Sequence, residues 1–251
     1  MMNQYLIDYT IHLADNTLIL SQRNAEWCGH GPVLEQDIAI TNISLDLIGQ
    51  ARNFYQYAAQ CIGDGCDEDK LAFLRSEREF KNCLLVELPK GDWAQTVLRQ
   101  FFFSSYQFYL YTELKKSSDL QIAAIAEKSL KEVTYHLRWS SEWVIRLGDG
   151  TEESRSRMLN AIDALWMYTG ELFHPVSYET GAAKDGIAVD INLLKPGWEE
   201  KVKEIFAEAT LPYPGKIIPQ VGGKEGKHTE HFGYILADMQ YMQKTYPDSE
   251  W

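Results

Sequence analysis

The sequence predicts an all-α protein built on a bundle of long helices. Apolar residues recur at spacings of three, four and seven along most of the chain, which is the period of helices with one buried face. Hydrophobic residues make up 45% and aromatic residues 12% of the 251 residues, enough for a sizeable core. Two pairs of long helices are separated by one long, less regular connection.

The first two predicted helices span residues 4–23 and 34–62. Between them lies the segment EWCGHGP, whose glycines and Pro32 break the helical pattern. Gly49 lies on the polar stripe of the second helix, where glycine costs ~1 kcal/mol relative to alanine, so close packing is expected there. The expected inward residues are Ile7, Ile11, Ala14 and Leu18 on the first helix, and Leu34, Ile38, Leu45, Ile48, Tyr55 and Ala59 on the second.

The next two predicted helices follow an irregular segment, residues 63–91, which holds a short helix near residues 71–80. Asp92 caps the third helix, with Gln95 completing a capping-box pattern, and this helix reaches about residue 116. The fourth helix spans residues 119–147, with Ser118 or Asp119 as its cap. Its apolar stripe is Ala126, Leu130, Val133, Leu137, Val144 and Leu147.

The four helices therefore form two hairpins joined by a connection of nearly thirty residues. A long crossover between hairpins is typical of the ferritin-like four-helix bundle. Additional C-terminal helices are expected at residues 151–173, 196–209 and 227–244. We expect one domain over residues 1–251, with a core bundle at 4–147 and a helical extension at 151–246.

A di-iron site in such a bundle needs a Glu on each of two helices and Glu-x-x-His on each of the other two. The first helix offers Asp15, and the second offers Asp46 with Gly49 where the template demands His. The fourth helix keeps His136 but has Val133 in place of Glu. The third helix has no Asp, Glu or His between residues 93 and 112. Three of the six expected ligands are therefore absent, and Asp15 and Asp46 are shorter than the Glu of the template.

The sequence predicts no catalytic, cofactor-binding or metal-binding residues in this chain. Asp15, Asp46 and His136 are interpreted as the remnant of a polar core, in which Asp46 and His136 form a structural pair. The alternative is a self-sufficient di-metal oxidase that also uses Glu132, which lies four residues before His136. His228, Glu230 and His231 are interpreted as a solvated start of the last helix.

Composition excludes several classes of function. The net charge of −12 argues against binding to nucleic acid or to anionic membrane surfaces. No apolar run is long enough to span a membrane, and the N-terminal stretch lacks the pattern of a signal peptide. The expected location is therefore cytoplasmic. The spacing of the four cysteines does not match a zinc site, so they are expected to be buried or free thiols.

Several stretches resemble the non-catalytic C subunits of bacterial phenylacetyl-CoA epoxidases, which are ring-1,2-epoxidising monooxygenases. The most specific is Glu26-Trp27-Cys28-Gly29-His30 followed by Leu45-Asp46-Leu47-Ile48-Gly49-Gln50-Ala51-Arg52-Asn53. Others are DEDKLAFLRSEREFKNCLLVELP, KEVTYHLRW and HTEHFGYILADMQYMQ. The resemblance covers nearly the whole chain, in order.

The resemblance implies a ferritin-like subunit that lacks iron ligands and structurally supports a catalytic A subunit. That partner would hold the di-iron site and the acyl-CoA, and a reductase would deliver electrons from NADPH. Phenylacetate catabolism would be the setting. The remaining alternative is a helical interaction module unrelated to oxygenation. Spare aromatic residues are expected to serve a partner interface, among them Trp139, Trp143, Trp166 and Tyr168.

Overall fold

The computed structural model describes residues 3–216, 218–247 and 249, and in these residues the regular structure is entirely helical. The chain divides into two compact units. The first unit comprises residues 1–89 and 222–251, and the second comprises residues 90–221. Within the described residues, no helix combines the length and apolar character that crossing a membrane requires.

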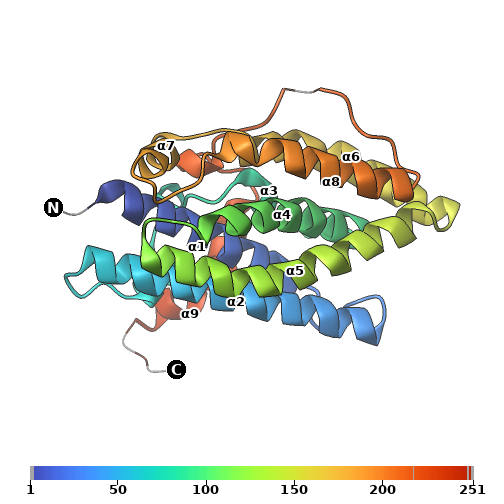
Figure 1. The fold of residues 1–251 in the computed structure, drawn as a ribbon. Helices are drawn as coiled ribbons and strands as arrows, with labels where there is room; N and C mark the ends of the chain where they lie inside the picture. Colours follow the sequence, from blue (N-terminus) through green and yellow to red (C-terminus); the bar gives the residue numbers. More distant parts are fainter. Residues whose placement is uncertain (1–2, 217, 248, 250–251) are drawn as a thin grey trace. The chain divides into compact units, whose positions relative to one another are not determined.

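The first unit is built on a hairpin of two long helices, α1 (Gln4–Ala25) and α2 (Leu34–Ile62), which run side by side (Figure 1). In the turn between them, the Asp37 carboxylate accepts hydrogen bonds from the backbone N–H of Gly29 at 3.1 Å and of Gly31 at 2.8 Å. Gly29 has a φ of +78°, a conformation that favours glycine. The EWCGHGP segment thus has a structural role, closing the hairpin.

Helix α2 has apolar residues on two faces, and for most of its length the buried face differs from the predicted one. Tyr55 and Ala59 are buried as predicted. Leu34, Ile38, Leu45 and Ile48 were also predicted to face inward, but they are 72%, 52%, 60% and 38% exposed. The buried face is the longer unbroken stripe of Ile40, Ile43, Leu47, Ala51, Phe54 and Ala58.

The remainder of the first unit consists of residues 63–89 and the C-terminal segment. In place of the short helix expected at residues 71–80 there is a π-helical turn, Lys70–Leu74, and a 3₁₀ turn, Glu77–Glu79. A short helix, α3 (Leu84–Glu87), follows. The last helix, α9 (Phe232–Thr245), begins later than the predicted residue 227.

The second unit is built on a second hairpin, α4 (Trp93–Leu114) and α5 (Leu120–Gly148). Asp92 and Asp119 are confirmed as caps, since Asp92 accepts from the Gln95 N–H at 3.0 Å and Asp119 accepts from the first turn of α5. The return bond of the predicted capping box, from the Gln95 side chain to the Asp92 N–H, is not observed among the described residues. Helix α6 (Glu152–Thr169) continues as a 3₁₀ helix, Gly170–Phe173. The short α7 (Ser177–Lys184) and α8 (Lys195–Glu208) complete the unit.

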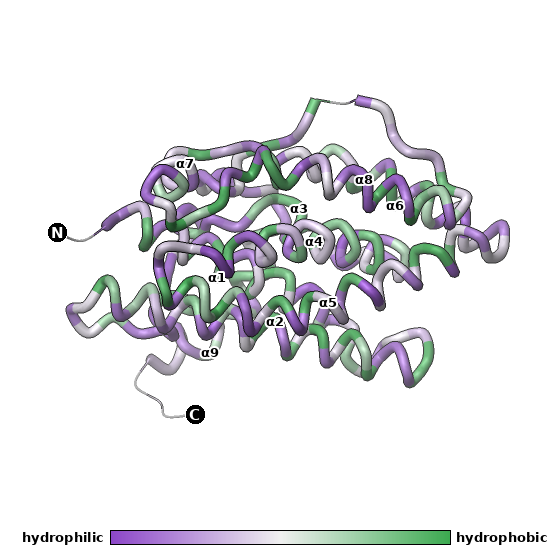
Figure 2. Tube along the Cα trace, in the orientation of Figure 1, coloured by the Kyte–Doolittle hydropathy of each residue, from purple (hydrophilic) through white to green (hydrophobic). Residues whose placement is uncertain are grey.

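Helices α4, α5, α6 and α8 pack against one another within this unit. Figure 2 shows hydrophobic and hydrophilic residues interleaved along these helices, as amphipathic packing requires. Trp139 was expected at a partner surface, but it is 7% exposed and packs edge-on against Trp93, with ring centroids 6.0 Å apart. Trp143, Trp166 and Tyr168 are half-buried.

Candidate functional site

Asp15, in the middle of α1, is fully buried and is the best-defined of the predicted polar-core residues. Its Oδ1 accepts hydrogen bonds from the Tyr55 hydroxyl at 2.5 Å and from Arg75 Nη2. Its Oδ2 accepts from Arg75 Nη1 at 3.1 Å and from the Lys81 backbone N–H at 2.7 Å. Every donor comes from the first unit. The carboxylate charge is therefore neutralised by a two-pronged guanidinium contact.

The surroundings of Asp15 keep both of its partners protonated. Burial and the Asp15 charge raise the pKa of Tyr55 well above its usual value. Burial alone would lower the pKa of Arg75, but the charge of Asp15 and its hydrogen bonds to the guanidinium outweigh that effect and raise the pKa. The Arg75 guanidinium also lies 4.0 Å from the centre of the Phe80 ring. This is a structural ion pair. The Asp15 oxygens that would coordinate a metal ion already accept hydrogen bonds from N–H and O–H donors.

The partnership of Arg75 with Asp15 was not predicted from the sequence. The two residues are sixty positions apart, and Arg75 lies in the irregular segment that periodicity describes poorly. The sequence did indicate that Asp15 needs a partner, because it lies in the middle of the apolar face of α1. A carboxylate in that position requires a buried cation or several hydrogen-bond donors.

Of the other predicted residues, Asp46 is half-buried on α2, in the first unit. His136 is fully buried and Glu132 half-buried on α5, in the second unit. The pairing of Asp46 with His136 and the grouping of both with Asp15 stay predictions. In the described residues, no three His, Cys, Asp or Glu side chains lie close enough together to hold a metal ion.

The remaining template positions carry side chains that are not metal ligands of the expected kind. Val133 is fully buried, and Gly49 is exposed with no atom within 4 Å of where a Cβ would lie. The close packing expected at Gly49 is therefore wrong within this chain. On α4, Gln100 is fully buried and its amide N–H donates to the Ser104 hydroxyl at 2.8 Å.

A second buried ion pair lies in the first unit and joins residues far apart in the sequence. Glu87 Oε2 accepts from His228 Nδ1 at 2.7 Å and from the Asn82 amide at 2.7 Å, and Oε1 accepts from the Thr229 backbone N–H at 2.6 Å. The side chains of Glu87 and His228 are both fully buried. The backbone carbonyl of Glu87 accepts two further bonds from Arg23, at 3.1 and 2.8 Å.

His228 is held as an imidazolium by this arrangement. Its Nδ1 faces the Glu87 carboxylate and its Nε2 faces the Phe80 carbonyl at 3.1 Å, and both of these groups only accept hydrogen bonds. Burial lowers the pKa of His228, but the hydrogen bond and charge of Glu87 outweigh that effect and raise the pKa overall.

The prediction that His228 opens a solvated helix is wrong. Because the backbone at Thr229 is bonded to Glu87, the helix starts only at Phe232. The sequence signal for this pair was Glu87 itself, the single charged residue within the apolar run LLVEL.

Comparison with known proteins identifies the chain's relatives. A curated relative, the C subunit of the 1,2-phenylacetyl-CoA epoxidase of Escherichia coli (strain K12), is 50% identical over 250 residues, covering all of both chains. The family described as "Phenylacetic acid catabolic protein" matches residues 1–251. The all-α, ferritin-like fold class predicted from the sequence is confirmed. By both measures, this chain belongs to the phenylacetic acid catabolic protein family.

Proposed function

We propose that this chain is the structural, metal-free subunit of a cytoplasmic, multicomponent di-iron monooxygenase that epoxidises phenylacetyl-CoA in aerobic phenylacetate catabolism. It supports a catalytic, ferritin-like A subunit that holds the iron, and a reductase delivers electrons from NADPH. The observation that carries the proposal is the full-length relationship to a protein named as the C subunit of such an epoxidase. A subunit by definition acts with others.

The surroundings of Asp15 support the metal-free part of the proposal. In di-iron bundles a carboxylate from this part of the fold binds metal. Here the Asp15 oxygens are bonded to Arg75, Tyr55 and the backbone of Lys81, so the charge is balanced by the protein itself. A guanidinium in that position also repels a cation. The same reasoning disfavours a self-sufficient di-metal oxidase that uses Asp15.

The exposed apolar face of α2 supports docking of a helical partner. Leu34, Ile38, Leu45 and Ile48 lie along one stripe, about 21 Å long at the helical rise per residue, in which Thr41 separates the first pair from the second. We call this stripe the α2 surface. Exposed large apolar residues gathered on one face of a helix are typical of protein interaction sites. The proposed occupant is a helix of the catalytic subunit, because the E. coli relative is named as one subunit of an epoxidase.

Gly49 adds to this argument, since it lies next to Ile48 on the exposed part of α2. Glycine inside a helix is unfavourable, and no atom of this chain fills the space beside it. Small residues let two helix backbones approach closely. A partner helix that packs on the α2 surface would explain the glycine, because Gly49 lets the two helix backbones approach closely. Packing within this chain does not explain it.

The decisive experiment is reconstitution of the complex from purified subunits. The catalytic subunit with reductase alone should show little turnover, and adding this chain should restore NADPH- and O₂-dependent epoxidation. Iron analysis of each subunit, produced with ample iron, should find the metal in the catalytic subunit and far less than one iron per chain here. Full turnover without this chain would overturn the supporting role, and stoichiometric iron in this chain would overturn the metal-free role.

A further inference from the structure

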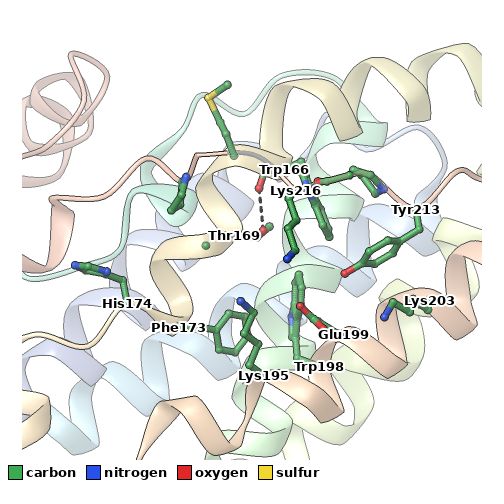
Figure 3. Close-up of a pocket in the computed structure, with 15 residues that line it drawn as sticks. Trp166, Thr169, Phe173, His174, Lys195, Trp198, Glu199, Lys203, Tyr213 and Lys216 are labelled. Carbon is green, nitrogen blue, oxygen red and sulfur yellow. Dashed lines mark hydrogen bonds between the residues drawn. The ribbon is translucent and has the colours of Figure 1, made fainter.

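A cavity of about 540 Å³ opens in the second unit between α6, α8 and the segment that follows α8 (Figure 3). Its aromatic wall is formed by Trp166 of α6 and Trp198 of α8, which stack with ring centroids 5.8 Å apart and planes 27° apart. Tyr213 meets Trp166 edge-on, at 5.2 Å between centroids and 79° between planes. Because Trp198 is almost wholly buried behind Trp166, the aromatic surface open to a ligand is that of Trp166 and Tyr213.

The two tryptophans are fixed by hydrogen bonds of their indole N–H groups. Trp198 is 3% exposed, and its Nε1–H donates to the Phe102 carbonyl at 2.9 Å. Trp166 Nε1–H donates to the Gly215 carbonyl at 3.3 Å, which holds the segment after α8 against α6.

A second attachment holds that same segment. The backbone N–H of Gln220 donates to the Met167 carbonyl at 3.0 Å. Pro219 lies so close to Gly170 that a Cβ at the glycine would overlap the proline Cβ. The wall of the cavity is therefore formed before any ligand binds, and this lowers the entropic cost of binding.

The cavity is positive on an acidic protein. Lys195, Lys203 and Lys216 line it, against one carboxylate, Glu199, whereas the whole chain has a net charge of −12. Figure 3 shows the three lysine side chains around the Trp166–Trp198 pair. Lys203 Nζ lies 5.0 Å from the Tyr213 ring centre. In the described part of the chain, none of these three lysines forms an ion pair with a carboxylate.

These two properties together define the class of ligand. An apolar ligand would remove water from the ammonium groups without pairing them, and an inorganic anion would leave the exposed ring surfaces of Trp166 and Tyr213 uncovered. We propose that this cavity binds a flat aromatic molecule that carries negative charge. Its volume lies within the ~300–1,000 Å³ range of small-molecule sites. A nucleoside phosphate and an aryl carboxylate share this chemistry.

The proposal goes beyond the function proposed above, because it gives a ligand site to a chain for which no catalytic role is expected. It can be tested on the isolated full-length chain, so its outcome is independent of reconstitution. The probes for isothermal titration calorimetry are ADP and benzoate, with inorganic phosphate and neutral benzyl alcohol as comparisons. ADP or benzoate should bind at least ten-fold more tightly than phosphate and benzyl alcohol. The tighter of the two shows whether the ligand is a nucleoside phosphate or an aryl carboxylate.

Matched variants test the location. Lys195→Gln with Lys216→Gln should weaken binding of the favoured probe at least ten-fold. The control, Lys128→Gln with Lys131→Gln, removes the same charge from exposed positions on α5 and should leave binding unchanged. Trp166→Leu tests the aromatic wall and should also weaken binding. Circular dichroism checks that each variant is folded. Three results would each overturn the proposal. These are no binding of ADP or benzoate at millimolar concentration, equal loss of affinity in both double lysine variants, and phosphate binding as tight as ADP binding.

Discussion

Asp15 illustrates what a buried charge requires of the residues around it. Four hydrogen bonds from Arg75, Tyr55 and Lys81 converge on one carboxylate, and three different parts of the first unit supply them. A buried ion pair is costly to break because removing one partner leaves the other charged and unpaired. This cluster therefore fixes residues 75–81 against α1 and α2.

We expect Arg75→Met to destabilise the first unit strongly. It would leave the Asp15 carboxylate buried without a cation, at a cost of about 3–5 kcal/mol. The matched control is Arg52→Met, since Arg52 is exposed and lies 3.5 Å from Glu68, and an exposed pair contributes only about 0–1 kcal/mol. Urea unfolding followed by circular dichroism measures both. Equal losses for the two variants would show that the Asp15 charge is satisfied in some other way.

We expect His228→Gln to destabilise the protein in a pH-dependent manner. Because the pKa of His228 is raised in the folded state, the stability it contributes is complete below the unfolded pKa of about 6.5 and is lost as pH rises through the folded pKa. The difference from wild type should thus be largest near pH ~6, at about 1.5–3 kcal/mol for a charged hydrogen bond, and should shrink toward pH ~9.

Denaturant unfolding at a series of pH values measures this difference. His231→Gln is the control, since His231 is 37% exposed and lies 4.0 Å from the exposed Glu230. A His228→Gln effect that stays constant across the whole pH range would contradict the imidazolium assignment.

At the scale of elements, helix ends were predictable where a local side chain determines them. Asp92 and Asp119 cap α4 and α5 through bonds to residues two or three positions away, and short-range sequence contains that information. The start of α9 was not predictable, because Glu87, more than 140 positions earlier, bonds the backbone of Thr229. The buried face of α2 was also ambiguous, since two apolar stripes satisfy the same periodicity.

We expect Gly49→Ala to stabilise the isolated chain by up to about 1 kcal/mol, because the helix gains a better helix former and a Cβ meets no atom within 4 Å. Gly148→Ala is the contrasting variant at the end of α5. A Cβ there would lie 2.6 Å from the Ala209 carbonyl oxygen, so it should lower stability. Thermal melts distinguish the two. A lower melting temperature for Gly49→Ala would mean that the site is packed after all.

At the scale of the whole molecule, the exposed α2 surface leads to a prediction about assembly with the catalytic subunit. Leu45→Ser with Ile48→Ser should weaken association with the catalytic subunit at least ten-fold while leaving this chain folded, since both residues are exposed. Leu120→Ser with Leu193→Ser is the control, because these residues are 84% and 74% exposed on the second unit. Analytical ultracentrifugation of mixed subunits gives the affinities. Unchanged affinity for the α2 variant would place the interface elsewhere.

The ferritin-like class was predictable because periodicity and the long crossover are features of the sequence itself. The polar clusters were not, because charge pairs such as Arg75 with Asp15 depend on which distant segments meet. The predicted remnant of Asp15, Asp46 and His136 named one residue of the observed ion pair and missed its cation. The periodicity of apolar residues identifies the apolar faces of a helix. The charge pairs between distant residues depend instead on which segments the fold brings together.

The Glu87–His228 pair has a consequence for how the polypeptide is made. Residues 80–88 receive their partners from residues 228 and 229, so the first unit is interrupted by the whole of the second, residues 90–221. On the ribosome, the N-terminal hairpin emerges long before the segment that neutralises Glu87. Until then that carboxylate has no imidazolium beside it, and closing so long a loop is slow. Residues 1–89 of the nascent chain can therefore complete their unit only after the C-terminal segment from residue 222 emerges, whereas the inserted unit is contiguous and can fold as it is synthesised.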